Sequence, residues 1–152
     1  MTESERPTVV IGAAEAGTVT ISALGRVHGS ASDFWDGNWL HTPVDIAVGG
    51  FTGDIPASLR AEEFRAFREE LERVYADLTG TATLKSMEDW LHLTVAVEAR
   101  GLITVTGRAI DAHGSGNQLH FRIRGLDQSY LPPVISALIA LEEAFPVLGT
   151  PQ

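Results

Sequence analysis

The chain has 152 residues, 44% of them hydrophobic, so we expect residues 1–152 to fold as a single domain with one apolar core, preceded by flexible residues 1–7. The absence of cysteine excludes disulfide scaffolds, thiol catalysis and cysteine-ligated metal centres. A formal net charge of −9 at pH 7 disfavours direct binding to nucleic acid or to an anionic membrane.

The N-terminal third of the chain is predicted to be extended. Residues 8–12 and 18–27 alternate and are rich in β-branched side chains, which indicates two strands. Residues 28–38 are rich in glycine, serine and aspartate and are predicted to form a loop. Residues 39–51 resume the extended pattern. Because Pro43 cannot donate a ladder hydrogen bond, we expect an edge or a bulge there.

The clearest element is an amphipathic helix over residues 59–78. Its apolar side chains recur at spacings of three, four and seven, which places them on one helical stripe. Charged side chains fill the opposite face. Ser58 is the expected N-cap and Gly80 the expected C-terminal stop. The apolar stripe consists of Leu59, Phe64, Phe67, Leu71, Val74, Tyr75 and Leu78.

The second half of the chain repeats the order of strands followed by a helix. Each strand has one apolar and one polar face, which is typical of an antiparallel sheet with one wet side. A largely buried helix follows over residues 130–145, with Pro132 and Pro133 in its first turn. The expected strands are residues 81–86, 90–98, 102–112 and 117–125.

This order of elements predicts an α+β fold. The absence of alternating strands and helices argues against a parallel, doubly wound sheet. We expect a single curved antiparallel β-sheet of about six to eight strands, with two helices packed on one face.

The negative charge is concentrated in two segments that contain no lysine or arginine. Residues 27–59 hold four aspartates, and residues 125–152 hold three acids. One interpretation is a solvated face that aids solubility. The other is a patch complementary to a basic protein partner, where electrostatic steering would raise the association rate. The four aspartates are Asp33, Asp36, Asp45 and Asp54.

No catalytic, metal-binding or phosphate-binding motif is recognisable. His92 and His120 lie on the polar faces of predicted strands, but a metal site would need three or four converging ligands. Glu88 beside Trp90 could be a carboxylic acid in an apolar pocket, although such an acid more often caps a turn. We therefore expect no enzymatic activity and no cofactor.

Two tryptophans, two aspartates and an asparagine fall within seven residues, between Asp33 and Trp39. Tryptophan is enriched at binding hot spots, so the run is a candidate interface. The alternative is structural, with the rings wedged under the helix and a side-chain-stabilised turn leading into the strand. The candidate partner-binding residues are Asp33, Trp35, Asp36, Asp45 and Asp54.

This run is also the first of several short motifs in one order, through which residues 17–149 resemble the WapI-type immunity family. The motifs are Asp33-Phe34-Trp35-Asp36-Gly37-Asn38-Trp39-Leu40, Gly49-Gly50-Phe51, Glu63 with Phe67, Ala82-Thr83-Leu84 with Glu88, Gly116-Asn117 with Leu119 and Phe121, Asp127-Gln128-Ser129-Tyr130-Leu131, and Phe145-Pro146-Val147. The family is similar to proteins that neutralise the C-terminal toxin of a cell-wall-associated, contact-dependent system. That toxin type is a nuclease acting on tRNA.

The resemblance implies a cytoplasmic, non-catalytic inhibitor that binds a basic protein, namely a nuclease toxin domain. A cytoplasmic location also agrees with the polar first seven residues, which lack the features of a secretory signal. The resemblance brings no known toxin-contact motif, so it assigns no interface residue. Two alternatives stay open: a small-molecule-binding or enzymatic domain that uses the curved sheet as a pocket, or an oligomerising domain. The chain could be a monomer or a homodimer.

Overall fold

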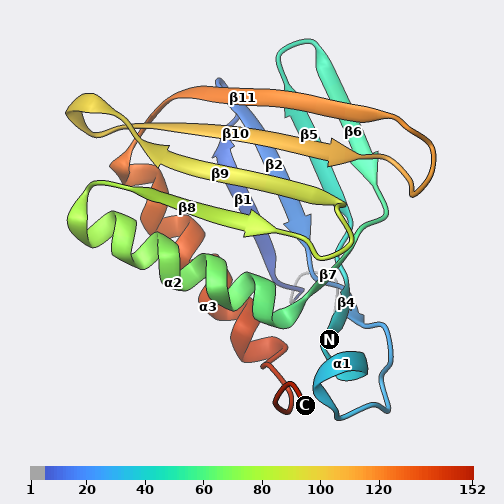
Figure 1. Cartoon of the computed structure of the whole chain (residues 1–152). Helices are drawn as coiled ribbons and strands as arrows, with labels where there is room; N and C mark the ends of the chain where they lie inside the picture. The colour runs from blue at the N-terminus through green and yellow to red at the C-terminus, as the bar shows by residue number, and fades with distance from the viewer. Residues whose placement is uncertain (1–5) are drawn as a thin grey trace.

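The computed structural model of this protein describes residues 6–152 (Figure 1). These residues form antiparallel β-sheets and α-helices, so the α+β class is confirmed. The expectation of one curved sheet of six to eight strands is wrong, because the strands form three separate sheets. Residues 1–7 are expected to be flexible, and residues 1–5 of this segment lie outside the described residues.

The first sheet, called here the N-terminal sheet, has four strands in the order β1-β2-β5-β6. Alternate side chains such as Val19 and Ile46 are buried, while others such as Asp45 face solvent. This alternation gives the sheet one apolar and one wet face. Its strands are β1 (Thr8–Ala13), β2 (Gly17–Ser22), β5 (Val44–Val48) and β6 (Phe51–Ile55).

The second sheet, called the C-terminal sheet, has the order β11-β10-β9-β8 and matches the four strands expected in the second half of the chain. Its buried side chains, such as Leu93 and Val105, again alternate with polar ones. The strands are β8 (Thr81–Lys85), β9 (Leu91–Val97), β10 (Leu102–Ile110) and β11 (Gln118–Asp127).

A third, small sheet has the order β3-β4-β7 and contains β3 (Gly25–Arg26), β4 (Trp39–His41) and β7 (Ser58–Arg60). Two prolines separate it from the N-terminal sheet: Pro43 lies between β4 and β5, and Pro56 between β6 and β7. Because proline lacks the N–H that continues a ladder, the strands change sheet at these points.

The long strands expected over residues 18–27 and 39–51 are therefore divided between two sheets. After β4, a side chain accepts a backbone hydrogen bond in place of the neighbouring strand. The buried hydroxyl of Thr42 accepts a hydrogen bond from the N–H of Leu59, 2.8 Å away. This bond holds β4 against β7 where regular pairing ends.

The two long helices occupy the predicted segments, as α2 (Ala61–Asp77) and α3 (Leu131–Ala144). A short helix, α1 (Phe34–Gly37), lies within the segment expected to be a loop. Short 3-10 turns at Ala99–Gly101 and Gln128–Tyr130 connect the later elements. Within residues 6–152, no helix combines the length and apolar character needed to cross a membrane.

Both expected ends of the first long helix are corrected by the structure. Ser58 belongs to β7, and the side chain of Glu63 reaches back instead to accept a hydrogen bond from the N–H of Arg60 at 2.7 Å. At the other end, Leu78 adopts the left-handed conformation (φ 51°) and ends α2 two residues before Gly80.

The two large sheets meet along β11 and open toward β8, and the helices fill the open side (Figure 1). The helix α2 lies against β8, while α3 lies against α2 and β1. Buried side chains of both helices, such as Phe67 and Leu138, belong to the same core cluster as the inner faces of the sheets. On the surface, Arg68 of α2 forms an ion pair with Glu142 of α3.

Candidate partner-binding surface

The five side chains predicted to bind a partner lie in two separate parts of the fold. Asp45 and Asp54 are on β5 and β6, whereas Asp33, Trp35 and Asp36 are in or next to α1. The helix α1 lies at the end of the molecule that carries the C-terminus, and the turn between β5 and β6 lies at the opposite end (Figure 1). The prediction thus divides into two candidate surfaces.

The first surface contains the aromatic cluster, Phe34, Trp35 and Trp39, which surrounds the buried guanidinium of Arg60. The Arg60 side chain is 1% exposed. Its Cζ lies 4.7 Å from the ring centroid of Trp39, 5.2 Å from that of Phe34 and 5.4 Å from that of Trp35. Two of its nitrogens donate to the backbone oxygens of Trp35 (2.8 Å) and Phe34 (2.6 Å). Its Nε also forms an ion pair with Glu62 Oε2 at 2.5 Å. The carboxylate, the rings and the carbonyls together compensate a buried cation.

The structure therefore explains most of the aromatic run without a partner. Asp33 is the N-cap of α1, since its Oδ2 accepts a hydrogen bond from the N–H of Asp36 at 3.1 Å. Trp39 is half-buried against Arg60, and Trp35 is 47% exposed. Only Trp35 and the two aspartates remain open to a partner on this surface, so their role in binding stays a prediction.

Arg60 was not singled out from the sequence, although a signal exists. It is the one charged residue in the otherwise uncharged stretch Ala57–Ala61, directly before the helix. Its neighbour Glu63 is also mostly buried, and its second oxygen accepts a hydrogen bond from the N–H of Met87 at 2.6 Å. Burial raises the pKa of Glu63 to about 7, outweighing the backbone hydrogen bonds from Arg60 and Met87 that lower it; the negative charge of Glu62 adds to the rise.

The second surface centres on a like-charge pair. Asp45 of β5 and Asp54 of β6 lie directly opposite each other on the outer face of the N-terminal sheet, and both are exposed. Among residues 6–152, neither carboxylate forms an ion pair with a basic side chain. Partial burial, a hydrogen bond with Asp54 and the negative charge of Asp54 all raise the pKa of Asp45. Like charges in this position destabilise a sheet.

Next to this pair is a hollow of about 210 Å³, called here the β6 groove. It lies between β6 and the neighbouring end of the β10–β11 hairpin (Figure 1). Its apolar lining includes Phe51, Ile55, Ile110 and Leu119, and its carboxylates are Asp54 and Asp111. None of its lining residues is basic. The remaining lining residues are Thr52, Gly53, Ala109, Asn117 and Gln118.

The second carboxylate of the β6 groove is held in place by its own loop. Asp111 accepts hydrogen bonds from the hydroxyl of Ser115 at 2.5 Å and from the amide of Asn117 at 3.0 Å. These two bonds lower the pKa of Asp111. The groove therefore carries a fixed negative charge on the side opposite β6.

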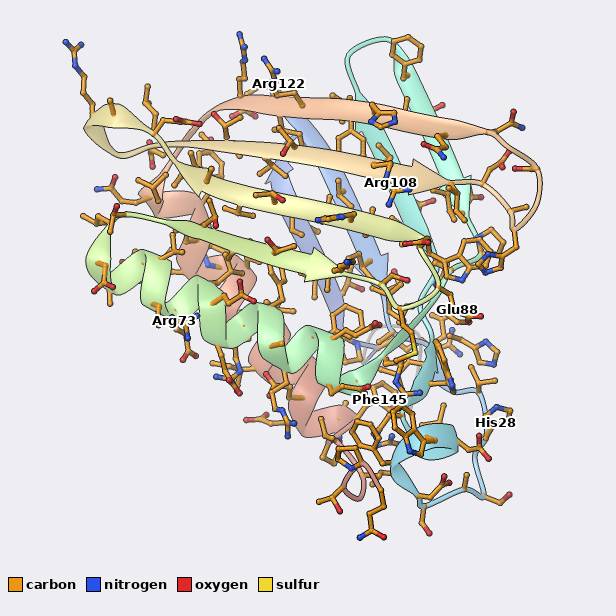
Figure 2. All side chains as sticks on the ribbon, viewed as in Figure 1. His28, Arg73, Glu88, Arg108, Arg122 and Phe145 are labelled. Atoms are coloured by element: carbon orange, nitrogen blue, oxygen red, sulfur yellow. The ribbon has the colours of Figure 1, made fainter. Side chains whose placement is uncertain are left out.

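The outer face of the C-terminal sheet has the opposite charge. One row of side chains crosses all four strands, and two arginines follow on β11; Arg108 and Arg122 are labelled in Figure 2. One ion pair lies beside this face, with Arg108 Nη2 3.8 Å from an oxygen of Asp89. This basic face could not be recognised from the net charge of −9, and its residues are separated in the sequence because they alternate with inward-facing ones along each strand. The basic side chains are Lys85, His92, Arg108, His120, Arg122 and Arg124.

The remaining catalytic and metal-binding candidates do not converge. Arg108 lies in register between His92 and His120, so the two histidines do not face each other. Glu88 lies in the turn between β8 and β9, at a polar hollow of about 410 Å³ (Figure 2). Trp90 is mostly buried, with its ring 4.3 Å from that of His113. No group of three histidine or acidic residues within residues 6–152 could hold a metal ion.

Comparison with known proteins places nearly the whole chain in one family. Residues 10–146 match the family model described as the immunity protein WapI-like family. No curated protein is similar enough to match the chain. The family match agrees with the resemblance carried by the aromatic run and the motifs that follow it.

Proposed function

The chain belongs to the WapI-like immunity protein family, and we propose on that basis that it neutralises a nuclease toxin domain by binding it, without catalysis of its own. Immunity in this sense needs only a stable complex that keeps the toxin from its nucleic-acid substrate. An RNA-binding surface must be basic, so an acidic protein surface is its natural complement.

The observation that best supports this proposal is the uncompensated pair Asp45 and Asp54. Two carboxylates that face each other without a basic neighbour lower the stability of the free protein. A lysine or arginine of the toxin placed between them would remove the repulsion and form charge-assisted hydrogen bonds. The cost of the pair in the free protein would be recovered in the complex.

The basic face of the C-terminal sheet does not oppose this proposal, because it lies on a different sheet. A molecule with separated charges orients itself in the field of a charged partner before contact. We propose that the N-terminal sheet leads in the encounter with a basic toxin, and that the outer, basic face of the C-terminal sheet is turned away.

Co-expression with the toxin domain encoded beside this protein tests the proposal. We expect cells to survive when both proteins are made and to die when the toxin is made alone. With purified proteins, a stable complex and loss of tRNA cleavage should appear together. Cells that die equally with and without this protein, for every adjacent candidate toxin, would contradict the proposed function.

A further inference from the structure

We infer that the β6 groove is the docking site for the toxin domain, and that it receives one apolar side chain from an extended, basic segment of that toxin. This inference rests on the proposed function and specifies its interface. Three observations carry it: an unexplained glycine, an exposed phenylalanine on a free strand edge, and a one-sided distribution of charge.

Gly53 lies in the middle of β6, where glycine weakens a strand because it adds no packing and loses more backbone entropy than other residues. Its backbone does not require glycine, since φ is not positive there. A Cβ atom added at Gly53 would meet no heavy atom within 4 Å. Neither conformation nor crowding explains this glycine. Its effect is to leave the β6 groove open.

Phe51 lies on the same wall of the groove as Gly53, two positions earlier along β6. It is 67% exposed, the largest exposure of any large hydrophobic side chain among residues 6–152. The adjoining hollow of about 210 Å³ is larger than the roughly 150 Å³ apolar cavity that admits a benzene ring. One large apolar side chain would therefore fit there and cover Phe51.

The groove borders a free strand edge, because β6 is the last strand of the N-terminal sheet. The two-residue turn Gly49–Gly50 pairs Val48 with Phe51. In a two-residue hairpin this first pair is hydrogen-bonded, and every second pair along the strands is hydrogen-bonded after it. Thr52 and Asp54 belong to the pairs in between, so their backbone N–H and C=O groups point away from β5. An extended segment of a partner can pair with these groups while its side chain enters the groove.

The charges around the groove define the rest of the partner. Asp54 and Asp111 line an opening that has no lysine, arginine or histidine in its lining. Asp45 adds a third carboxylate next to it, opposite Asp54 on the outer face of the sheet. A segment with basic residues on either side of an apolar one would match this pattern. An acidic or purely apolar segment would leave the carboxylates without partners at a buried interface.

The deciding experiment fills the groove with a side chain of this protein. Gly53→Leu should fold with at least wild-type resistance to urea, yet bind the purified toxin domain at least ten-fold more weakly. Gly29→Leu is the matched control, since Gly29 also has an open surrounding and no positive φ but lies in the loop before α1. The control should bind with the wild-type dissociation constant.

The outcomes separate the inference from the proposed function. If wild type binds the toxin and Gly53→Leu binds equally well, the groove is not the docking site, although the immunity role stands. If wild type binds no candidate toxin, both fail.

A second pair of variants tests the site without adding bulk, in case Gly53→Leu does not fold. Asp45→Asn with Asp54→Asn and Asp33→Asn with Asp36→Asn change the net charge by the same amount. The first pair should weaken binding at least ten-fold. The second pair, at α1, should weaken it less than three-fold, because asparagine still caps a helix. If the Asp33 and Asp36 variant instead loses more affinity than the Asp45 and Asp54 variant, the interface lies at the aromatic cluster and the inference is wrong.

Discussion

The side chain of Asn38 and the backbone of Leu148, 110 residues apart, exchange two hydrogen bonds in the manner of paired strands. The Asn38 amide nitrogen donates to the carbonyl oxygen of Leu148 at 2.9 Å, and its oxygen accepts from the N–H of Leu148 at 2.8 Å. The same nitrogen donates to the carbonyl oxygen of Phe34 at 2.9 Å. One buried side chain thus fastens the C-terminal segment to α1.

Replacing Asn38 should consequently destabilise the protein although no apolar core side chain is lost. Asn38→Ala leaves the N–H and the carbonyl oxygen of Leu148 without their side-chain partner. It also removes one of the two hydrogen bonds to the carbonyl oxygen of Phe34, which still accepts from Arg60. The Asn38 side chain lost in this variant is 0% exposed. We expect a loss of about 2–4 kcal/mol in the free energy of unfolding, from the roughly 1–3 kcal/mol that each unsatisfied buried group costs. Urea denaturation measures it. The exposed Ser30→Ala should stay within about 0.5 kcal/mol of wild type.

Replacing Arg60 should lower the free energy of unfolding more than replacing Asn38. Arg60→Ala removes the cation between three aromatic rings, breaks its ion pair with Glu62 and leaves the carbonyl oxygen of Trp35 without its hydrogen bond. The carbonyl oxygen of Phe34 keeps only the bond from Asn38. We expect a loss of about 3–5 kcal/mol in the free energy of unfolding, as for a broken buried ion pair. A change in the tryptophan near-ultraviolet circular dichroism should accompany it.

The control for Arg60 is Arg65→Ala, on the exposed face of α2. This variant should lie within about 0.5 kcal/mol of wild type. Equal losses for Arg60 and Arg65 would contradict the structural role assigned to the aromatic cluster.

The buried carboxyl of Glu63 should make stability depend on pH. Its pKa is raised to about 7 from an ordinary value of 4.5, so between these values the folded protein binds a proton that the unfolded chain has released. Stability should therefore fall as pH rises through this window, by up to about 3 kcal/mol. Urea denaturation at pH 5 and pH 8 should show a smaller decrease for Glu63→Gln than for wild type. A variant with the same pH slope as wild type would remove Glu63 as the cause.

Relieving the like-charge pair should stabilise the free protein. Asp54→Asn removes the repulsion on Asp45 while keeping the size and shape of the side chain. We expect a gain of about 0.2–1 kcal/mol at pH 7, the range measured for cross-strand pairs. Thermal unfolding in low salt would show it as a higher midpoint, and a lower midpoint would mean that the pair is not strained.

The sequence was sufficient to predict the elements with a regular apolar period. The stripe of α2 and the alternation in β8–β11 each place one face in the core, and these elements appear where they were expected. Sheet membership could not be predicted in this way. Pro43 and Pro56 mark where strands are interrupted, but only the three-dimensional structure shows that β4 then lies between β3 and β7 and pairs with both.

The candidate site could likewise be predicted from the sequence only in part. The excess of aspartates in residues 27–59 is visible in the sequence, but the pairing of Asp45 with Asp54 depends on the register set by the Gly49–Gly50 turn. The contribution of Asp111 to the same surface depends on how the C-terminal sheet packs over the N-terminal one. Likewise, the basic face became visible only when its residues were aligned across four strands.

The separation of charge between the two sheets leads to a prediction about association kinetics. Arg122→Glu with Arg124→Glu makes the protein more acidic by four charges but changes only the C-terminal sheet. Asp45→Lys with Asp54→Lys makes it less acidic by four charges on the N-terminal sheet. If the β5–β6 face meets a basic toxin, the lysine variant should associate at least ten-fold more slowly than wild type. The arginine variant should associate as fast as wild type or faster, because long-range attraction to the toxin increases.

Raising the salt concentration should reduce the difference between these two variants, since the Debye length falls from about 10 Å at 0.1 M to about 3 Å at 1 M. Stopped-flow measurement of the association rate at both concentrations provides the test. Slower association of the arginine variant, with the lysine variant unaffected, would place the toxin on the C-terminal sheet instead.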